Sequence, residues 1–370
     1  MIDPRSRQTS RSARHTLPVL ALATLALLAS CAGSRVSEDA LDEARRSEDV
    51  TLVAFGSCAR EDRTQEIWDS IVATRPDVFL FIGDNVYVDI PDVPERREQF
   101  TEAYAELAAK PGWQELNRRT PVLATWDDHD FGKNDAGAEW ELKDVAQEEF
   151  LDFFGVPADS PRRARKGVYH AETMGEAGRR VQVILLDTRY HRSPLREADP
   201  RPEGRGPYAP DRSEGAQLLG EEQWIWLEQQ LRAPAELRIV ASSIQVVADE
   251  HGWECWGNLP AERERLYGLI ESTGARGVLF VSGDRHLIEI SRDDGGTYPL
   301  WDFTSSGFNW GESEVEEPNR HRRGPVLREP NFGTIAVDWS TPDPTVTLTG
   351  HGLDGRALMR ETFGLGDLAP

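Results

Sequence analysis

Short apolar runs alternate with stretches of helical periodicity along most of the chain. The apolar runs predict strands at residues 50–55, 77–82, 121–125, 167–172, 181–187, 237–243, 277–282 and 298–306. Helical periodicity predicts helices at 64–73, within 95–117, and at 143–154, 220–231 and 261–271. Two further runs, 332–339 and 345–351, flank the turn STPDP and predict an antiparallel hairpin. This alternation predicts an α/β fold.

The N-terminal residues depart from this pattern. A leader with several arginines precedes an apolar run at 17–30, which is typical of a secretory signal and too short for a spanning helix. The tetrad Leu-Ala-Ser-Cys at 28–31 resembles a bacterial lipoprotein box, which implies cleavage after residue 30 and a lipid on the Cys31 thiol. An ordinary signal with a chance cysteine is the alternative.

The rest of the chain divides into a tether and one domain. Residues 31–49 are polar and acidic, which predicts a flexible tether. No linker interrupts residues 50–370, so we expect a single domain that ends in the hairpin. With the signal at 1–30, we expect an exported protein, lipid-anchored to the bacterial cell envelope on its periplasmic or outer-membrane face.

The net charge narrows the class of partner. The 370 residues carry a formal charge of -22, which argues against a nucleic-acid-binding surface and against an anionic membrane surface read by basic residues. If the protein binds an anion, local cations must overcome this field. The sequence leaves the oligomeric state open.

Reactive side chains follow several of the predicted strands. In open α/β sheets ligands bind beyond the carboxyl ends of the strands, so side chains placed there are expected to meet at one edge. These side chains are Cys58, Asp84, Tyr87, Asp128, His129, Gln245, Asp284 and His286.

The densest group is the segment WDDHDFG, in which Asp127, Asp128 and Asp130 surround His129. Gathered carboxylates either protonate or are neutralised by cations. Hard oxygen ligands with few histidines favour Ca, Mn, Mg or Fe(III) over a zinc-only site. Asp127 and Asp130 could also support the ligands indirectly or cap a helix.

The motif set FGSC, GDNVY, WDDHDFGKND, LLDTRYHR, LGEEQWIWLEQQL, SGDRH and FTSSG resembles the alkaline phosphatase D family, the PhoD-like members of the calcineurin-like metallophosphoesterase superfamily. The resemblance extends from Thr51 to about Asp354. It implies a four-layer α/β/β/α sandwich of two facing mixed sheets. It also implies hydrolysis of small-molecule phosphoric esters with Fe(III) and Ca²⁺ as cofactors, Mn²⁺ or Zn²⁺ being possible substitutes.

The same resemblance implies roles for individual residues. Asp84 would bridge two metals, Tyr87 would ligate a ferric ion, and Cys58 would lie near or on that ion. His129 would contact the phosphate or protonate the leaving group. The further metal ligands implied are Asp128, Asp284 and His286. The sequence departs from the wider superfamily at 242–245, where Gly-His is absent, so either Gln245 or water would complete that metal site.

Cations near these motifs are candidates for binding the phosphate. Arg189 is the expected anion clamp because a guanidinium donates two hydrogen bonds to phosphate, although a salt bridge with Asp187 is an equal alternative. The other candidate substrate-binding cations are Arg192, Arg285 and Lys133.

The two cysteines beyond residue 31 allow several readings. Cys58 is a metal ligand, a buried thiol or half of a disulfide with Cys255. Cys255 itself sits between tryptophans and is expected to be a small apolar residue.

Three functions fit these observations. The first is a secreted, lipid-anchored phosphatase or phosphodiesterase in which metal-activated water attacks phosphorus and releases phosphate. The second is a phospholipase-type phosphodiesterase acting on lipid headgroups. The third is a noncatalytic metal-binding surface lipoprotein. The preference for monoesters or diesters depends on loop shape, which the sequence does not reveal.

Overall fold

The computed structural model describes residues 49–88, 97–311 and 317–370. The expected signal, Cys31 and residues 31–48 of the expected tether lie outside these ranges. All of the described residues belong to one compact unit. Within those ranges, none of the helices combines the length and apolarity needed to cross a bilayer.

The first sheet joins the start of the chain to its end. Among the described residues it has six strands, in the order β13-β12-β11-β1-β2-β3. The strands β1, β2 and β3 are parallel, and β11, β12 and β13 are antiparallel to their neighbours. Their bounds are β1 (Leu52–Gly56), β2 (Val78–Ile82), β3 (Val122–Thr125), β11 (Asn331–Asp338), β12 (Thr345–Gly352) and β13 (Ala357–Gly364).

The second sheet comes from the middle of the chain. In the described ranges it has seven strands, in the order β10-β8-β9-β7-β6-β5-β4. The strands β5, β6, β7 and β9 are parallel, and the others run antiparallel to their neighbours. Their bounds are β4 (His170–Met174), β5 (Val181–Leu185), β6 (Leu237–Ser242), β7 (Val278–Ser282), β8 (Ile288–Asp293), β9 (Leu300–Ser305) and β10 (Arg322–Leu327).

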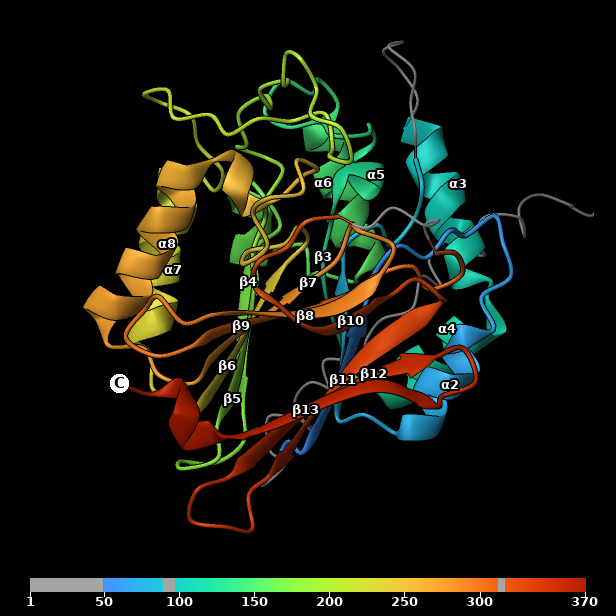
Figure 1. Cartoon of the computed structure of the whole chain (residues 1–370). Helices are drawn as coiled ribbons and strands as arrows, with labels where there is room; N and C mark the ends of the chain where they lie inside the picture. The colour runs from blue at the N-terminus through green and yellow to red at the C-terminus, as the bar shows by residue number, and fades with distance from the viewer. Residues whose placement is uncertain (1–48, 89–96, 312–316) are drawn as a thin grey trace, which may run out of the picture. The chain divides into compact units, whose positions relative to one another are not determined.

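Helices cover the outer faces of the two sheets (Figure 1). The helices α2 (Ile67–Thr74), α3 (Arg97–Ala108), α4 (Pro111–Arg119) and α6 (Lys143–Phe153) share a core with the first sheet. The helices α7 (Glu221–Arg232) and α8 (Pro260–Thr273) share a core with the second sheet. The short elements are α5 (Asp128–Phe131), η1 (Pro161–Ala164), η2 (Trp256–Asn258) and η3 (Leu365–Leu368).

Aromatic packing joins these layers. Between the sheets, the ring centroids of Phe55 on β1 and Phe303 on β9 lie 5.1 Å apart, edge to face. Outside the first sheet, Trp68 of α2 packs against Phe79 and Phe81 of β2 at 5.6 and 5.7 Å. Because both faces of the central strands are buried, these strands are continuous apolar runs rather than alternating ones. The structure confirms the predicted α/β/β/α sandwich of two mixed sheets.

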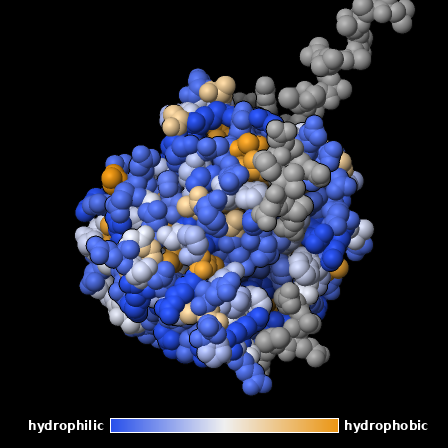
Figure 2. Space-filling view, turned by 90° about the horizontal axis from the view of Figure 1, so that it is seen from above, coloured by the Kyte–Doolittle hydropathy of each residue, from blue (hydrophilic) through white to orange (hydrophobic). Residues whose placement is uncertain are grey.

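Several elements depart from the sequence-based expectations. The helix α5 and the strands β8, β10 and β13 have no counterpart among the predicted elements, and β4 begins at His170 rather than at residue 167. The terminal hairpin is present and pairs Asp338 with Thr345 across its turn. On the face seen in Figure 2, hydrophilic residues predominate and apolar residues form small separate spots, in keeping with the charge of -22.

Tight turns at the strand ends bring the two sheets together at one edge. Gly83 follows β2 with φ +116°, a conformation that L side chains rarely adopt. A Cβ added at Gly83 would lie 2.7 Å from Cβ of Asp127 and 3.0 Å from Cβ of Ser243. The absence of a side chain at this position therefore lets loops from both sheets approach each other.

We expect Gly83→Ala to destabilise the protein by about 3 kcal/mol, because it adds a steric clash to the cost of the positive φ. Gly178→Ala is the matched control, since Gly178 also has a positive φ, +95°, but has nothing within 4 Å of an added Cβ. The control should cost only about 1–2 kcal/mol. Equal losses in denaturant unfolding would show that close approach at Gly83 is unimportant.

Candidate metal centre

The loops beyond the strand ends hold side chains in an unusual backbone conformation. Cys58, Asp84, Asp284 and His286 have φ values of 61°, 49°, 66° and 50°. Non-glycine residues adopt this left-handed region at a cost, and such strain gathers at functional sites where the surrounding structure holds it in place. The left-handed turns aim these four side chains at the space between the sheet ends.

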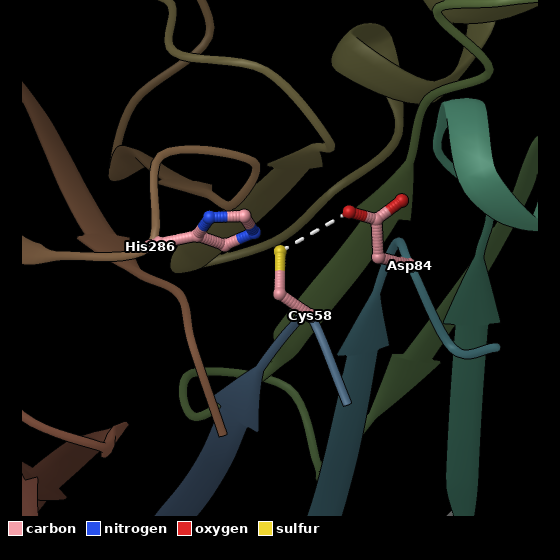
Figure 3. A group of neighbouring side chains, drawn as sticks. All are labelled: Cys58, Asp84 and His286. Atoms are coloured by element: carbon pink, nitrogen blue, oxygen red, sulfur yellow. Dashed lines mark hydrogen bonds between the residues drawn. The ribbon is translucent and has the colours of Figure 1, made fainter. Parts of the chain in front are cut away.

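Cys58, Asp84 and His286 form the first group of ligand-type side chains (Figure 3). They come from the ends of β1 and β2 and from the loop after β7, and their ligand atoms lie within 4.8 Å of one another. The Cys58 thiol donates to Oδ2 of Asp84 at 3.2 Å. Tyr87 joins the group, since its hydroxyl donates to Oδ2 of Asp84 at 3.3 Å and lies 3.2 Å from Nε2 of His286.

Two further groups continue from the first through shared carboxylates. Asp84 also groups with Asp128 and His129, and Asp128 in turn groups with Asp127 and Asp284. Carboxylates shared between adjacent groups suit a pair of neighbouring metal ions. The structure therefore brings together all six residues expected as metal ligands: Cys58, Asp84, Tyr87, Asp128, Asp284 and His286.

A fourth group contains two residues that the sequence did not single out. Asp135 and Glu254 lie with Asp128 in this group. Asp135 falls within the motif WDDHDFGKND, so its position beside the DDHD segment was an available signal. Glu254 sits in the loop before η2, where no motif marks it. Its partners in this group, Asp128 and Asp135, are more than 100 residues away in the sequence.

The carboxyls are crowded enough to perturb one another when no cation is bound. Burial raises the pKa of Asp84 and of Asp284 well above the usual value, and the charges of Asp127 and Asp128 add to both shifts. Burial also raises the pKa of Asp127 to about 7, although Arg189 opposes the shift. Burial alone would raise the pKa of Asp128, but His129 and Arg189 lower it below its usual value.

The same surroundings raise the pKa values of the Cys58 thiol and the Tyr87 phenol. Burial raises the pKa of Cys58 well above its usual value, and the charge of Asp84 adds to the rise. Burial likewise raises the pKa of Tyr87, with Cys58 and Asp84 contributing. A positive ion would reverse these shifts, because it favours the thiolate, the phenolate and the carboxylates.

The donor set fits metal ions. Oδ2 of Asp127 and Oδ1 of Asp128 are buried and have no hydrogen-bond partner among the described residues, which is costly unless a cation or other group satisfies them. Carboxylates suit hard cations, and the thiol, phenol and imidazole of Cys58, Tyr87 and His286 suit a transition metal. The residues present therefore fit two kinds of ion side by side.

Two of the arginines expected to bind substrate are buried in ion pairs beside the cluster. The Arg189 side chain is 0% exposed; its Nε donates to Oδ1 of Asp127 at 2.6 Å and its Nη1 donates to Oε1 of Glu254 at 2.8 Å. Arg192 is also buried and pairs with Glu254 at 3.1 Å. Both guanidiniums therefore lie in internal ion pairs. Asp187 accepts the backbone N–H of Arg189, whereas the guanidinium pairs with Asp127 and Glu254, so the alternative salt bridge is not formed.

The other two predicted cations have partners as well. Arg285 is buried and pairs with Glu317 at 2.5 Å, with Asp284 at 3.6 Å. Lys133 lies over the ring of Trp140, 5.4 Å from its centroid. The ion pairs around Arg189 and Arg285 thus neutralise part of the acidic cluster.

Four residues left open by the sequence have clear positions. Gln245 donates to Oε1 of Glu289 at 2.7 Å and to Oγ1 of Thr304 at 2.8 Å, while Ser243 donates to Asp127 at 2.6 Å. Gln245 is therefore held in a separate polar network. Cys58 and Cys255 are both free, so they form no disulfide.

Asp127 and Asp130 have different hydrogen-bonding roles. Asp130 accepts the backbone N–H groups of Asp127 at 2.6 Å and of Asn85 at 3.2 Å, which fixes the start of α5 and ties it to the loop after β2. Asp127 instead faces the cluster, held by Arg189 and Ser243. Of the two, Asp127 is the one that belongs to a ligand group.

The raised pKa values predict how stability depends on pH and cations. A carboxyl whose folded-state pKa is raised loses stability as pH climbs from the unfolded value of about 4 to the folded value. The pH range over which this stability is lost ends near pH 7 for Asp127 and near pH 8 for Asp135. We expect the chelated protein to melt several degrees lower at pH 8 than at pH 5.5, and returned Ca²⁺ and Fe³⁺ to raise the Tm more at pH 8. Equal melting of the chelated protein at the two pH values would contradict this.

Comparison with known proteins places the chain in a family. The family model described as PhoD-like phosphatase matches residues 53–317, more than half of the 370 residues. Alkaline phosphatase D of Bacillus subtilis (strain 168) is 23% identical over 269 residues, which cover 63% of this chain and 45% of that protein. The match thus spans less than half the length of that relative.

Solved structures share the fold at low sequence identity. The structure of PhoD superposes with a TM-score of 0.68 at 18% identity, covering 86% of this chain and 70% of that one. Purple acid phosphatase PPD1 from yellow lupin (Lupinus luteus) seeds gives 0.58 at 12% identity, covering 86% and 54%. GAP50, the anchor in the inner membrane complex of Plasmodium, gives 0.52 at 10% identity, covering 85% and 88%. The matching family model, together with the motifs present in the sequence, shows that this chain belongs to the PhoD-like phosphatase family.

Proposed function

We propose that this chain is a metal-dependent hydrolase of phosphoric esters. The observation that carries the proposal is the run of three ligand groups joined by Asp84 and Asp128 at the shared edge of the two sheets. Membership of the PhoD-like phosphatase family supports the same reaction class. When bound, the metal ions supply Lewis acidity and an activated water for attack on phosphorus.

The proposal assigns the ligand groups to two kinds of ion. Cys58, Tyr87 and His286, with Asp84, would hold Fe(III), because the phenol and thiol meet there. The remaining ligands are carboxylates, Asp84 being common to both sides, and would hold Ca²⁺. The carboxylate ligands on this side are Asp84, Asp127, Asp128 and Asp284.

His129 is the proposed general acid. Its ring stacks on Tyr87 with centroids 4.2 Å apart, and its backbone N–H donates to Oδ1 of Asp84 at 3.2 Å. Two contacts therefore hold the imidazole against the cluster, where a bound phosphoric ester would place its leaving oxygen. Proton transfer from His129 to that oxygen neutralises the alkoxide as the bond to phosphorus breaks.

Export and lipid anchoring through Cys31 complete the proposal, supported by the basic leader, the short apolar run and the lipoprotein-like tetrad. These features would put the hydrolase at the cell envelope, where it would release phosphate from external esters. The natural ester is left to experiment, because pocket width depends on loops at the edge of the site.

Hydrolysis of 4-nitrophenyl phosphate and bis(4-nitrophenyl) phosphate tests the reaction. We expect turnover by the purified protein, loss of turnover on exhaustive chelation, and recovery when Ca²⁺ and Fe³⁺ are returned. Mn²⁺ and Zn²⁺ serve as comparison ions. The ratio of the two rates decides between monoesterase and diesterase activity.

His129→Ala distinguishes catalysis from metal binding. It should lower turnover by about 100-fold or more while metal content, measured by mass spectrometry, stays at the wild-type level. Unchanged turnover at full metal content would reject His129 as the acid. A folded, metal-loaded wild type that hydrolyses neither ester would favour the noncatalytic alternative, unless lipid headgroup esters are cleaved instead.

The anchor has its own test. Mass spectrometry of the protein isolated from its membrane fraction should find a mature N-terminus at Cys31 carrying acyl chains. Cys31→Ser should lack the acylated peptide, whereas the control Cys255→Ser should retain it. An N-terminus at any other residue, or an unmodified Cys31, would refute lipid anchoring.

A further inference from the structure

The arginines near the site differ in whether they already form ion pairs with acidic side chains. Arg189, Arg192 and Arg285 are buried and paired with Asp127, Glu254 and Glu317. A guanidinium in such a pair cannot turn to a substrate without leaving a buried carboxylate unpaired, which is costly. Further positive charge for the substrate, beyond that of the metal ions, is therefore better sought at another side chain.

Arg63, in the loop after β1, meets that requirement. Its side chain is exposed, and in the described part of the chain no Asp or Glu oxygen lies within 4.0 Å of its guanidinium. Its neighbour Arg60 differs, because Asp62 holds it with two hydrogen bonds of 2.9 Å. The charge of Arg63 is thus available to a ligand.

Trp310 connects Arg63 to the metal centre. The guanidinium carbon of Arg63 lies 5.4 Å from the centroid of the Trp310 ring, a cation–π contact. The same ring lies 3.9 Å from the ring of His286 and 6.4 Å from that of Tyr87. Arg63 is therefore one aromatic ring away from two of the candidate ligands.

The loop that carries Arg63 is fixed before any ligand arrives. Asn309 accepts the backbone N–H of Arg60 at 3.1 Å and donates to the carbonyl oxygens of Arg60 at 2.8 Å and Thr64 at 3.2 Å. Lys110 donates to the carbonyl oxygen of Arg63 at 3.1 Å. These bonds tie the loop to the segment that bears Trp310, so little ordering remains to be done on binding.

A cavity beside Tyr87 has the contrary charge. It has a volume of about 680 Å³ and is lined by Tyr87 together with Glu61, Glu102 and Glu106. An anionic group on the leaving group would be repelled from that cavity and attracted to Arg63. Charge thus favours Arg63 over this cavity as the contact for such a group.

We propose that Arg63, held over Trp310, is a specificity subsite for a second anionic group, carried on the leaving group of the phosphoric ester. The proposal rests on the proposed function and names its substrate class: esters whose leaving group bears a carboxylate or a further phosphate. Arg63 acts by binding and does not touch the reacting phosphorus.

Calorimetric binding of two non-hydrolysable probes tests the subsite. Phenylphosphonate and 4-carboxyphenylphosphonate are titrated into the metal-loaded protein, and the ratio of their Kd values is the readout. We expect wild type to prefer the carboxyl probe, and Arg63→Gln to reduce that preference on the order of 5-fold, the upper range for an exposed ion pair. Arg63→Lys should keep most of the preference, because the charge remains.

Arg276→Gln is the matched control. Arg276 is also exposed and lies before β7, at the opposite end of the strand from Asp284, so this variant makes the same change in net charge away from the site. It should retain the wild-type ratio. An equal loss in Arg276→Gln, an unchanged ratio in Arg63→Gln, or no binding of either probe would overturn the subsite.

Hydrolysis separates the subsite from the proposed function. The same proteins are assayed with phenyl phosphate and 4-carboxyphenyl phosphate. If neither ester is cleaved while the calorimetric ratio still falls in Arg63→Gln, the subsite stands and the hydrolase proposal fails. If both esters are cleaved and the ratio of kcat/KM values is the same in Arg63→Gln as in wild type, the hydrolase proposal stands and the subsite fails.

Discussion

Mutual repulsion among buried carboxylates is the constraint that the rest of the structure must satisfy. Asp84, Asp127 and Asp128 are buried, Asp284 is half-buried, and the four converge at one sheet edge. Arg189 supplies one internal positive charge to this cluster and is already shared between Asp127 and Glu254. The remaining negative charge requires either protons or metal ions. Until such cations offset its charge, the cluster repels an anion, as the net charge of -22 also does.

Neither sheet contains the cluster alone. Asp84 and Asp128 follow strands of the first sheet, whereas Asp284 and Ser243 follow strands of the second. The spacing between these groups depends on the face-to-face packing of the sheets, to which the contact of Phe55 with Phe303 contributes. The geometry of the site therefore depends on the packing of the core, because a shift of one sheet against the other would separate ligands that share an ion.

The sequence was informative where chemistry follows directly from strand position. Cys58, Asp84, Asp128 and Asp284 all come directly after apolar runs, and parallel strands bring their ends together without further information. The two-sheet sandwich came from the motif resemblance, not from periodicity alone. The strand β13 escaped prediction because it is an exposed edge, where alternation is weak, and β8 because it starts straight after the SGDRH motif.

The roles of the arginines could not be read in the same way. Whether a guanidinium faces a substrate or a buried acid depends on loops far apart in the chain: Arg189 and Glu254 are separated by 65 residues. A motif shows that Arg189 is near the site but not which way its charge is directed. Gln245 is a similar case, since its partners Glu289 and Thr304 come from β8 and β9.

The left-handed backbone at Asp84 and Asp284 determines which substitutions can be interpreted cleanly. Asparagine tolerates this conformation nearly as well as aspartate and keeps its shape, so an Asn variant removes charge and leaves the turn intact. Valine or isoleucine would strain the backbone and remove the ligand together, and the two effects could not be told apart. Asp84→Asn and Asp284→Asn are therefore the substitutions that change the charge of these side chains and leave the backbone conformation as it is.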